Sequence, residues 1–465
     1  MLAETFVRWR KAREHRRAAR LTRAELEANK LAKFRRLVRF IEPRSAYYRR
    51  IIAERGLDVA SCKPGDFPVL TKSLLMQHFD EIATAPGVTK SAIAEFLTRS
   101  HDPAELFLDR YRVIHTSGSS GEVGYFVYSP ADWASGTAMR RQGARPARKR
   151  GAKGKFRMAY YAAVDGHYAG VTMVSAIRSS LARFFLDLEL FEVNDPLPDI
   201  VARLNEFQPE VLLGYTTALK ILAAEQRRGN LALERVISVM TAGEITTSAD
   251  MALLTETFGC PVVNSYACSE HLGMGASPPG SDKIVLYDDD LFFEPYADHT
   301  LVTNLFNYTL PLIRYRMADT LLPIPSEEYA PYLVIENIVG RNELLPRFKN
   351  RDGKEDFISP HTINEVFVAG VTHFQLHLLG DEEFRFMICL DETLDPAQRS
   401  AATAAVGARI REILARKRME NVRFDVVATG DLPVNPRTRK FQLILDRRGD
   451  EPAVTFPLGA VDKAG

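Results

Sequence analysis

The sequence has few cysteines and no long apolar run, and these two shortages exclude several classes of protein. Its 465 residues contain four cysteines without C-x-x-C spacing, so neither a disulfide scaffold nor a zinc ribbon is predicted. One pair, Cys268 and His271, is three residues apart, but a metal site of this kind needs a second such pair. No stretch approaches the ~18 apolar residues of a membrane helix, and no signal-peptide core opens the chain. We therefore expect a cytoplasmic protein with no membrane span.

The chain has almost no net charge, but its charge is unevenly distributed. Residues 1–50 contain 16 Lys/Arg and 5 Asp/Glu, a net charge of +11, which leaves −9 for the rest because the total is +2. Such an arm either contacts nucleic acid, acidic lipid or a partner, or is the solvated face of helices. We favour the solvated face and expect no nucleic-acid partner, because no base-reading motif accompanies the charge.

The stretch with the clearest chemical signal is Arg112 to Ser129, RVIHTSGSSGEVGYFVYS. A β-branched run enters it, a loop of hydroxyl residues and glycines follows, and a second strand-like run leaves it. Glycines allow tight turning and close approach to a ligand, and successive backbone N–H groups with hydroxyls can bind an anion. The alternative is a plain flexible turn. The loop is not a Walker A motif, because Glu122 rather than lysine follows Gly121.

Residues 1–55 are predicted to form a basic helical arm. Thr22 and Glu25 fit a capping box that starts a helix. Leu31, Phe34, Val38 and Ile41 then form one apolar stripe that we assign to the core, with the arginines on the wet face. Further along, PVLTKSLLMQHF predicts another helix start at Thr71.

From residue 156 onward, strand-like and helical patterns alternate. The strand-like runs are 157–163, 184–191, 210–215, 236–241 and 261–266, and helices from Thr216 and Ser248 end at Gly229 and Gly259. This alternation predicts parallel strands joined by right-handed crossovers. Ligands bind such sheets beyond the carboxyl ends of the strands.

Three consecutive loops at that predicted edge carry glycine, tyrosine and glutamate. They are Gly214-Tyr215-Thr216, Ala242-Gly243-Glu244 and Ser265-Tyr266-Ala267-Cys268-Ser269-Glu270. A tyrosine offers a flat face for a base, and a carboxylate beside phosphates is typical of Mg²⁺ binding. The alternatives are that Glu244 is a helix N-terminal charge and that Tyr266 packs in the core.

The last third of the chain predicts a β-rich stretch and then a separate small unit. Within 284–325, Asp319 at a strand end either accepts ribose hydroxyls or occupies a hairpin turn. The composition turns polar around Gly340-Arg341, which is the best candidate boundary. Beyond it we expect strands at 373–379, 384–390 and 422–428, a helix at 396–419, and a loop ending at Lys440 before a last strand at 441–445.

Taken together, these motifs resemble the adenylate-forming superfamily of acyl-CoA synthetases, adenylation domains and luciferases, and most closely its phenylacetate–CoA ligase branch. Five of the family's motifs occur in sequence order as Thr116–Gly121, Ala242–Glu244, Tyr266–Glu270, Tyr315–Asp319 and Gly340-Arg341, and Lys440 resembles the family's C-terminal lysine. The resemblance implies an α/β fold: a large N-terminal domain of mixed α/β sheets, 1–340, and a small, mobile C-terminal α+β domain, 341–465.

The resemblance also implies a reaction and a set of site residues. A carboxylate would attack the α-phosphate of ATP, and a thiol, usually coenzyme A, would then take the acyl group from the acyl-adenylate. Catalytic roles fall to Lys440 and to Glu270, which would hold Mg²⁺. Nucleotide contacts fall to Thr116, Ser117, Gly118, Ser119, Ser120, Gly121, Gly243, Glu244, Ser265, Tyr266, Asp319 and Arg341. Tyr160, Tyr161, Tyr215 and Ala267 would line the acid pocket, and Glu343 would occupy the hinge.

Several positions depart from the family pattern. Ala267 replaces a glycine, Glu343 an aspartate and Arg439 a glycine. These changes leave three hypotheses: an acid–thiol ligase, an enzyme of the same fold with a carrier protein, amine or other acceptor, and a catalytically inactive nucleotide-binding protein. A homodimer is compatible with each.

Overall fold

The computed structural model describes residues 2–116, 123–138, 154–178, 180–297, 299–339, 346–358, 362–363, 366, 368–430, 432–433 and 443–448. The chain divides into two compact units, Met1–Asn342 with His361–Phe367, and Glu343–Pro360 with Val368–Gly465. The predicted boundary at 340/341 lies outside the described residues. None of the described helices is long and apolar enough to cross a membrane.

The first unit begins with helices, and the local signals in the sequence place their starts correctly. They are α1 (Leu2–Ala18), α2 (Arg23–Ile41), α3 (Ala46–Glu54), α4 (Lys72–Gln77), α5 (Phe79–Ile82) and α6 (Lys90–Arg99), with a 3₁₀ turn at Pro64–Asp66. Thr22 and Glu25 form the predicted capping box, and Thr71 caps α4. Phe34, Val38 and Ile41 are fully buried, which confirms that the stripe faces the core.

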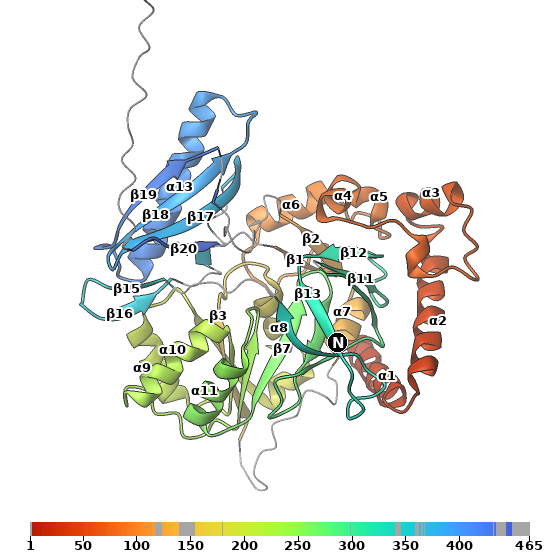
Figure 1. The fold of residues 1–465 in the computed structure, drawn as a ribbon, viewed down its shortest axis with the longest axis horizontal. Coiled ribbons are helices and arrows are strands. Elements are labelled where there is room, and N and C mark those ends of the chain that lie inside the picture. The colour runs from red at the N-terminus through yellow and green to blue at the C-terminus, as the bar shows by residue number, and fades with distance from the viewer. Residues whose placement is uncertain are drawn as a thin grey trace, which may run out of the picture. The chain divides into compact units, whose positions relative to one another are not determined.

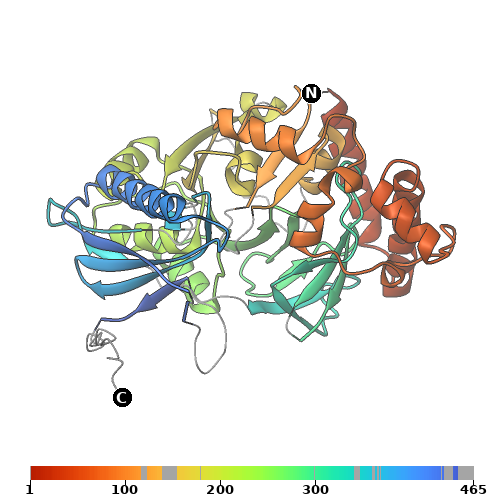
Figure 2. The same cartoon turned by 90° about the horizontal axis from the view of Figure 1, so that it is seen from above.

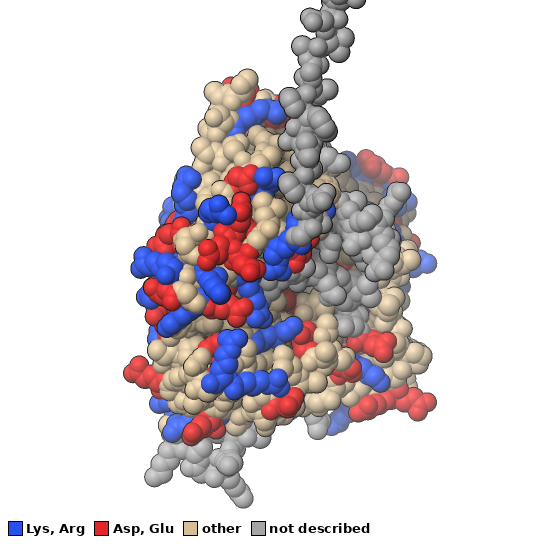
Figure 3. All heavy atoms as spheres, turned by 60° about the vertical axis from the view of Figure 1, so that its left-hand side comes forward, with Lys and Arg blue, Asp and Glu red and all other residues tan. Residues whose placement is uncertain are grey.

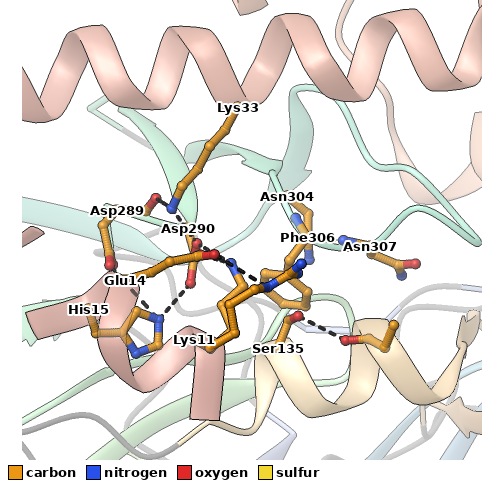
Figure 4. A network of polar contacts seen from close by, with 12 residues as sticks. Lys11, Glu14, His15, Lys33, Ser135, Asp289, Asp290, Asn304, Phe306 and Asn307 are labelled. Carbon is orange, nitrogen blue, oxygen red and sulfur yellow. Dashed lines mark hydrogen bonds and ion pairs between the residues drawn. The ribbon is translucent and has the colours of Figure 1, made fainter. Parts of the chain in front are cut away.

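The basic arm is less solvated than the sequence suggested. Lys11 and His15 on α1 and Lys33 on α2 contact Asp290, at Nζ–Oδ1 3.0 Å, Nε2–Oδ2 2.9 Å and Nζ–Oδ1 2.7 Å. Figure 4 shows the three side chains converging on this carboxylate. Burial is the largest single influence and lowers the pKa of the Lys11 ammonium, but the charges of Asp290 and Glu14 and their hydrogen bonds together leave that pKa raised. The expectation of a purely solvated arm is therefore wrong for these residues.

A β-hairpin and a short helix connect the helical region to the main sheet. β1 (Arg112–His115) pairs antiparallel with β2 (Tyr125–Tyr128), and α7 (Pro130–Gly136) follows. α1 is tied to this region, because Arg8 donates to the Thr137 carbonyl at 3.0 Å and Glu4 pairs with Arg112 at 3.0 Å. In both views of the fold, the red helices at the start of the chain lie at the border of the first unit (Figures 1 and 2).

The main sheet contains the predicted alternation of strands and helices. In sequence order it has β3 (Phe156–Ala162), α8 (Ala169–Arg178), β4 (Leu186–Glu192), α9 (Leu197–Phe207), β5 (Val211–Gly214), α10 (Thr216–Arg227), β6 (Ser238–Ala242), α11 (Ser248–Phe258) and β7 (Val262–Cys268). A 3₁₀ turn at Leu181–Phe184 precedes β4, which therefore starts later than predicted. Gly229 and Gly259 have φ of +79° and +63°, as expected where these helices end.

Five of these strands run parallel, in the spatial order β4-β3-β5-β6-β7. The connection through α8 leads from β3 to β4, toward one end of this order, whereas those through α9, α10 and α11 lead toward β7 at the other end. Because such connections are right-handed, α8 lies on the opposite face of the sheet from the other three helices. Figure 1 shows α9, α10 and α11 grouped together. The strand order reverses between β3 and β5, and this switch point is where doubly wound sheets bind ligands.

Antiparallel strands complete the first unit. β8 (Leu272–Ala276), β9 (Ile284–Leu286), β14 (Val334–Val339) and β13 (Thr320–Ile324) extend the main sheet beyond β7. β10 (Leu291–Pro295), β11 (Thr300–Asn304) and β12 (Tyr315–Met317) form a separate three-stranded sheet. A large apolar core runs from the N-terminal helices to these strands and includes Phe34, Trp133, Tyr266 and Tyr315.

The second unit is a small α+β structure. β15 (Arg347–Lys349) pairs with β16 (Glu355–Phe357), and the four-stranded order is β19 (Arg423–Ala428), β18 (Glu383–Leu390), β17 (Val371–Gly380), β20 (Ile444–Asp446). α13 (Pro396–Arg416) ends earlier than the predicted residue 419, and its buried side chains include Val406, Ile410 and Leu414.

Candidate active site

The three predicted loops meet at one edge of the main sheet. β5, β6 and β7 are neighbours and run parallel, so their carboxyl ends lie together. In register, Gly214 pairs with Thr241 and Ala242 with Ser265. One detail of the prediction is corrected: β7 continues to Cys268 and turns into antiparallel β8, so Ser265 to Cys268 lie in a strand rather than a loop. Only Ser269 to His271 form the turn.

Tyr266 and Asp319 are brought into direct contact, although they are far apart in sequence. The tyrosine Oη donates to the Asp319 Oδ2 at 2.8 Å. Asp319 lies between β12 and β13. The ring of Tyr266 belongs to the buried core, and burial together with the Asp319 charge raises the pKa of its hydroxyl. The ring of Tyr266 thus packs in the core, as the alternative interpretation stated. Its hydroxyl, in contrast, binds the Asp319 carboxylate at the edge of the sheet.

If this edge of the sheet binds ATP, as the sequence resemblance implies, we expect the substitution Tyr266→Phe to raise the KM for ATP about tenfold or more in pyrophosphate exchange. The change removes one hydrogen bond to a carboxylate, which typically contributes about 1.5 kcal/mol or more, and it leaves the buried ring in place. Steady-state exchange kinetics at varied ATP would measure this. An unchanged KM would mean that the bond serves packing alone.

Glu270 occupies the turn between β7 and β8, close to several charged and polar groups. Burial raises the pKa of its carboxyl, the Lys72 charge opposes that rise, and Asp319 adds to it. The turn is held from the core side, since Tyr128 Oη donates to the Ser269 carbonyl at 2.6 Å. The half-buried carboxyl is therefore stabilised in its ionised form by a nearby cation. A carboxylate that shares a cation with phosphates is a ligand set that suits Mg²⁺.

Glu244 joins two of the loops. Its Oε2 accepts the Thr217 backbone N–H at 2.7 Å, and its Oε1 accepts the Thr217 hydroxyl at 2.8 Å. Thr217 lies in the first turn of α10, so Glu244 is a negative charge at a helix N-terminus, as the alternative interpretation stated. The helix is α10, which precedes Glu244 in the sequence, and not α11, which follows it. Gly243 supplies the φ of +81° that lets the chain turn there. Burial raises the pKa of Glu244 to about 7.

This raised pKa predicts a pH-dependent stability. The folded-state pKa of about 7 lies above the usual 4.5, so the folded protein holds this proton more tightly than the unfolded chain does. The contribution of Glu244 to stability is therefore fully present below about pH 4.5 and is lost, by roughly 2–3 kcal/mol, as the pH rises through 7. In Glu244→Gln we expect this loss to disappear from urea unfolding curves recorded between pH 5 and 8. The same pH slope in both proteins would contradict the assignment.

The candidate phosphate loop is described only at its two ends. Thr116 N donates to the Gly124 carbonyl at 2.9 Å, and Gly124 N donates to Thr116 Oγ1 at 2.8 Å. These two bonds close the base of the loop at the end of the hairpin. Ser117, Gly118, Ser119, Ser120 and Gly121 lie outside the described residues, as do Arg341, Glu343 and Lys440.

The predicted acid pocket is only partly brought together. Tyr160 and Tyr161 are consecutive residues of β3, so they project from opposite faces of the sheet and cannot share a pocket on one face. A Cβ added to Gly170 would lie 2.3 Å from the Tyr160 hydroxyl, which places that hydroxyl against α8. Tyr215 precedes α10 beside the β3/β5 switch point, and Ala267 lies in β7.

Sequence reasoning missed two contributors to this site. The first is Lys72, the first residue of α4, whose positive charge acts to lower the pKa of the Glu270 carboxyl. Two backbone hydrogen bonds of Leu70 position this segment beside β12. The Leu70 N–H donates to the Arg314 carbonyl at 3.1 Å, and the Leu70 carbonyl accepts from the Arg316 N–H at 2.9 Å. Tyr128, which supports the Ser269 turn, is the other. The only signal in the sequence that could have identified Lys72 was its position as a basic residue at the start of a largely apolar helix.

The Cys268–His271 pair has other contacts in the described structure. Cys268 Sγ lies 3.4 Å from Met274 Sδ. His271 is fully buried, its Nδ1 is 3.5 Å from Asn304 Nδ2, and burial lowers its pKa to about 3.

Solved structures share this architecture. 2-Hydroxyisobutyryl-CoA ligase, in complex with 2-HIB-AMP and CoA in the thioesterification state, matches 92% of this chain and 90% of its own with a TM-score of 0.56 and 19% identity. The same ligase with R3-HIB-AMP in the postadenylation state matches 90% and 88%, with a TM-score of 0.51 and 17% identity. The chain therefore has the fold of the adenylate-forming ligases, as the sequence predicted.

Comparison by sequence gives a shorter match. Protein CapK of Staphylococcus aureus is 28% identical over 152 residues, which is 30% of this chain and 33% of CapK. The chain thus spans about a third of the length of this curated relative. No family model matches the chain. Assignment to the phenylacetate–CoA ligase branch stays a prediction.

Proposed function

We propose that the protein activates a carboxylic acid with ATP, forming an acyl-adenylate and pyrophosphate, and then transfers the acyl group to a thiol, for which we propose coenzyme A. The observation that carries this proposal is the meeting of Tyr266, Asp319 and Glu270 at the carboxyl edge of a sheet with the adenylate-forming ligase fold. A cytoplasmic location, a possible homodimer and the absence of a nucleic-acid partner in this reaction belong to the same proposal.

The residues at the sheet edge would divide the work between binding and charge stabilisation. Asp319, oriented by Tyr266, would accept the ribose hydroxyls. Thr116 to Gly121 would bind the terminal phosphates through backbone N–H groups and hydroxyls. Glu270 would hold Mg²⁺, which supplies positive charge to the phosphate oxygens when bound. Lys72 would favour the ionised form of the Glu270 carboxyl, against the opposing effect of burial.

The chemistry consists of two balanced substitutions. In the first, a carboxylate oxygen of the acid forms a bond to the α-phosphorus of ATP, and pyrophosphate leaves. In the second, the thiol sulfur bonds to the acyl carbon, AMP leaves, and the thiol proton passes to solvent. Both transition states concentrate negative charge on oxygens, so fixed donors and cations placed there lower the barrier.

The experiment that tests the proposal is ATP–pyrophosphate exchange over a panel of aromatic and aliphatic carboxylates. We expect at least one acid to stimulate exchange, and product assays with and without coenzyme A then identify the acceptor. An acid-dependent exchange without a CoA thioester would select the alternative acceptor, a carrier protein, amine or other cofactor. No stimulation by any acid would favour an inactive nucleotide-binding protein.

For Lys440 we predict an asymmetric effect. Lys440→Ala should lower adenylation by roughly 100-fold, because a cation near the α-phosphate stabilises the first transition state. It should change thioester formation from a supplied acyl-adenylate by less than about threefold. Single-turnover measurements of the two half-reactions separate these rates. Equal losses in both would contradict the role assigned to this lysine.

A further inference from the structure

Helix α1 buries two polar side chains against the protein and leaves two aromatic side chains exposed. The buried side contains Lys11 and His15, which meet Asp290. On the other side, Phe6 is 62% and Trp9 51% exposed. A helix that packs only against its own protein buries its aromatics and exposes its charges. The two exposed aromatic rings of α1 are therefore the feature that packing within this protein does not explain.

That outer face is strongly basic as well as aromatic. At 100° per residue, the exposed side chains of Phe6, Trp9, Arg10, Arg13, Arg16 and Arg17 fall within an arc of about 120°. The arc contains no Asp or Glu. Arg10 pairs with exposed Glu14 at 3.5 Å, whereas Arg13, Arg16 and Arg17 form no ion pair with any described residue. We call this set of six residues the α1 outer face.

A surface whose charged residues are all positive is not found everywhere on this molecule. On the face shown in Figure 3, Lys/Arg and Asp/Glu side chains are interspersed. The α1 outer face has four arginines, of which only Arg10 is paired with a carboxylate. An anionic surface would therefore be attracted to it more strongly than to a face of mixed charge.

We propose that the α1 outer face is a docking surface for an anionic phospholipid bilayer, on which the helix lies flat. Arginines are attracted to anionic headgroups, and tryptophan and phenylalanine partition into the headgroup region, where an apolar ring contacts acyl chains while its edge stays hydrated. The attachment is peripheral. It does not depend on the proposed reaction, because none of the six residues belongs to the candidate active site.

The arrangement of the aromatics favours a bilayer over nucleic acid. Proteins that bind single strands stack bases on open ring faces. In α1 the guanidinium of Arg13 lies 4.8 Å above the Trp9 ring, and the Phe6 ring is 6.1 Å from it at an interplanar angle of 30°. Arg13 therefore covers one face of the Trp9 ring, while the exposed edge of that ring and the Phe6 side chain can still enter a headgroup layer.

The protein carries its own spectroscopic probe for this contact. It has two tryptophans, and the other one, Trp133, is fully buried. We expect vesicles of phosphatidylcholine with 30% phosphatidylglycerol to bind the full-length protein, shift its tryptophan emission to the blue and reduce iodide quenching. Pure phosphatidylcholine should do neither, and 0.5 M NaCl should reverse binding. Trp9→Phe should still bind but lose the spectral change.

Paired variants test the residues themselves by vesicle co-sedimentation. Arg13→Gln with Arg17→Gln should weaken binding by roughly 30-fold, since each cation near an anionic surface contributes a factor of about five. Phe6→Ser with Trp9→Ser should weaken it about threefold or more. The matched control, Arg110→Gln with Arg235→Gln, removes two exposed arginines elsewhere in the first unit and should change binding less than threefold. Circular dichroism confirms that each variant is folded.

Three results would overturn the proposal. The first is no binding to anionic vesicles by the wild-type protein. The second is tighter binding to a duplex oligonucleotide than to these vesicles, which would assign the face to nucleic acid. The third is an equal loss in the control pair, or a loss confined to a variant that neutralises Arg148, Lys149 and Arg150. Those three residues lie in the basic segment 139–153, outside the described residues and outside the proposed surface.

Discussion

Replacing Glu270 by glutamine is expected to lower ATP–pyrophosphate exchange by roughly 100- to 1,000-fold, the range typical for removal of one preorganised charge-stabilising group. The glutamine keeps the size of the side chain and removes only the negative charge. In the account given above, that charge holds Mg²⁺ against the phosphates, so its loss affects the chemical step more than the binding of the acid.

The same substitution should leave the fold intact or slightly more stable. Burial raises the pKa of the Glu270 carboxyl, so the folded protein is destabilised when this group ionises at neutral pH. A neutral glutamine avoids that cost. A loss of exchange without a loss of stability therefore separates a metal-binding role from a structural one.

Tyr128→Phe provides the matched control for this prediction. It removes the hydrogen bond to the Ser269 carbonyl and so loosens the turn that carries Glu270, but it leaves the carboxylate in place. We expect exchange to fall by less than about tenfold, with partial recovery at high Mg²⁺. If Glu270→Gln retained exchange within tenfold of the wild-type rate, the assignment of Glu270 as the metal ligand would be wrong.

Replacing Asp290 by alanine is expected to lower the free energy of unfolding of the first unit by about 3–5 kcal/mol. Asp290 is buried and is the common acceptor for Lys11, His15 and Lys33. Without it, two ammonium groups that are largely removed from water lose their closest carboxylate. Urea unfolding followed through buried Trp133, which lies in the same unit, measures the change.

Glu14→Ala is the control for Asp290. Glu14 also contacts Lys11, at 3.1 Å, but its side chain is 37% exposed. Exposed ion pairs contribute little, so we expect a loss below about 1 kcal/mol. If Asp290→Ala were no more destabilising than Glu14→Ala, the buried cluster would not be what holds α1 and α2 to the strands.

Local sequence signals were sufficient for most of the main sheet. The runs before Tyr215 and Gly243 are short and apolar, and glycines end α10 and α11, so both the element types and the parallel arrangement follow from nearby residues. The second unit was predicted for the same reason. The ends of elements were less certain: β7 extends through Tyr266 to Cys268 because pairing with β8 stabilises it, and that pairing is not visible in a local pattern.

The features that could not be predicted all depend on contacts between distant residues. Lys11 and Asp290 are separated by 279 positions, and a run of three aspartates alone is most simply interpreted as a solvated loop. Lys72 reaches the site because its segment pairs with the strand near Arg316. Tyr160 and Tyr161 were assigned to one acid pocket on the basis of the family resemblance, whereas strand geometry puts them on opposite faces of the sheet.

The central claim is that a carboxylate attacks the α-phosphate of ATP at the edge of the main sheet. The most direct test is isotope transfer from an acid labelled with ¹⁸O in its carboxylate, chosen from those that stimulate exchange. After acyl transfer, the account predicts one ¹⁸O atom in AMP and none in inorganic phosphate or pyrophosphate, as seen by mass spectrometry. Label in inorganic phosphate, with ADP as the nucleotide product, would show attack at the γ-phosphate and contradict the account.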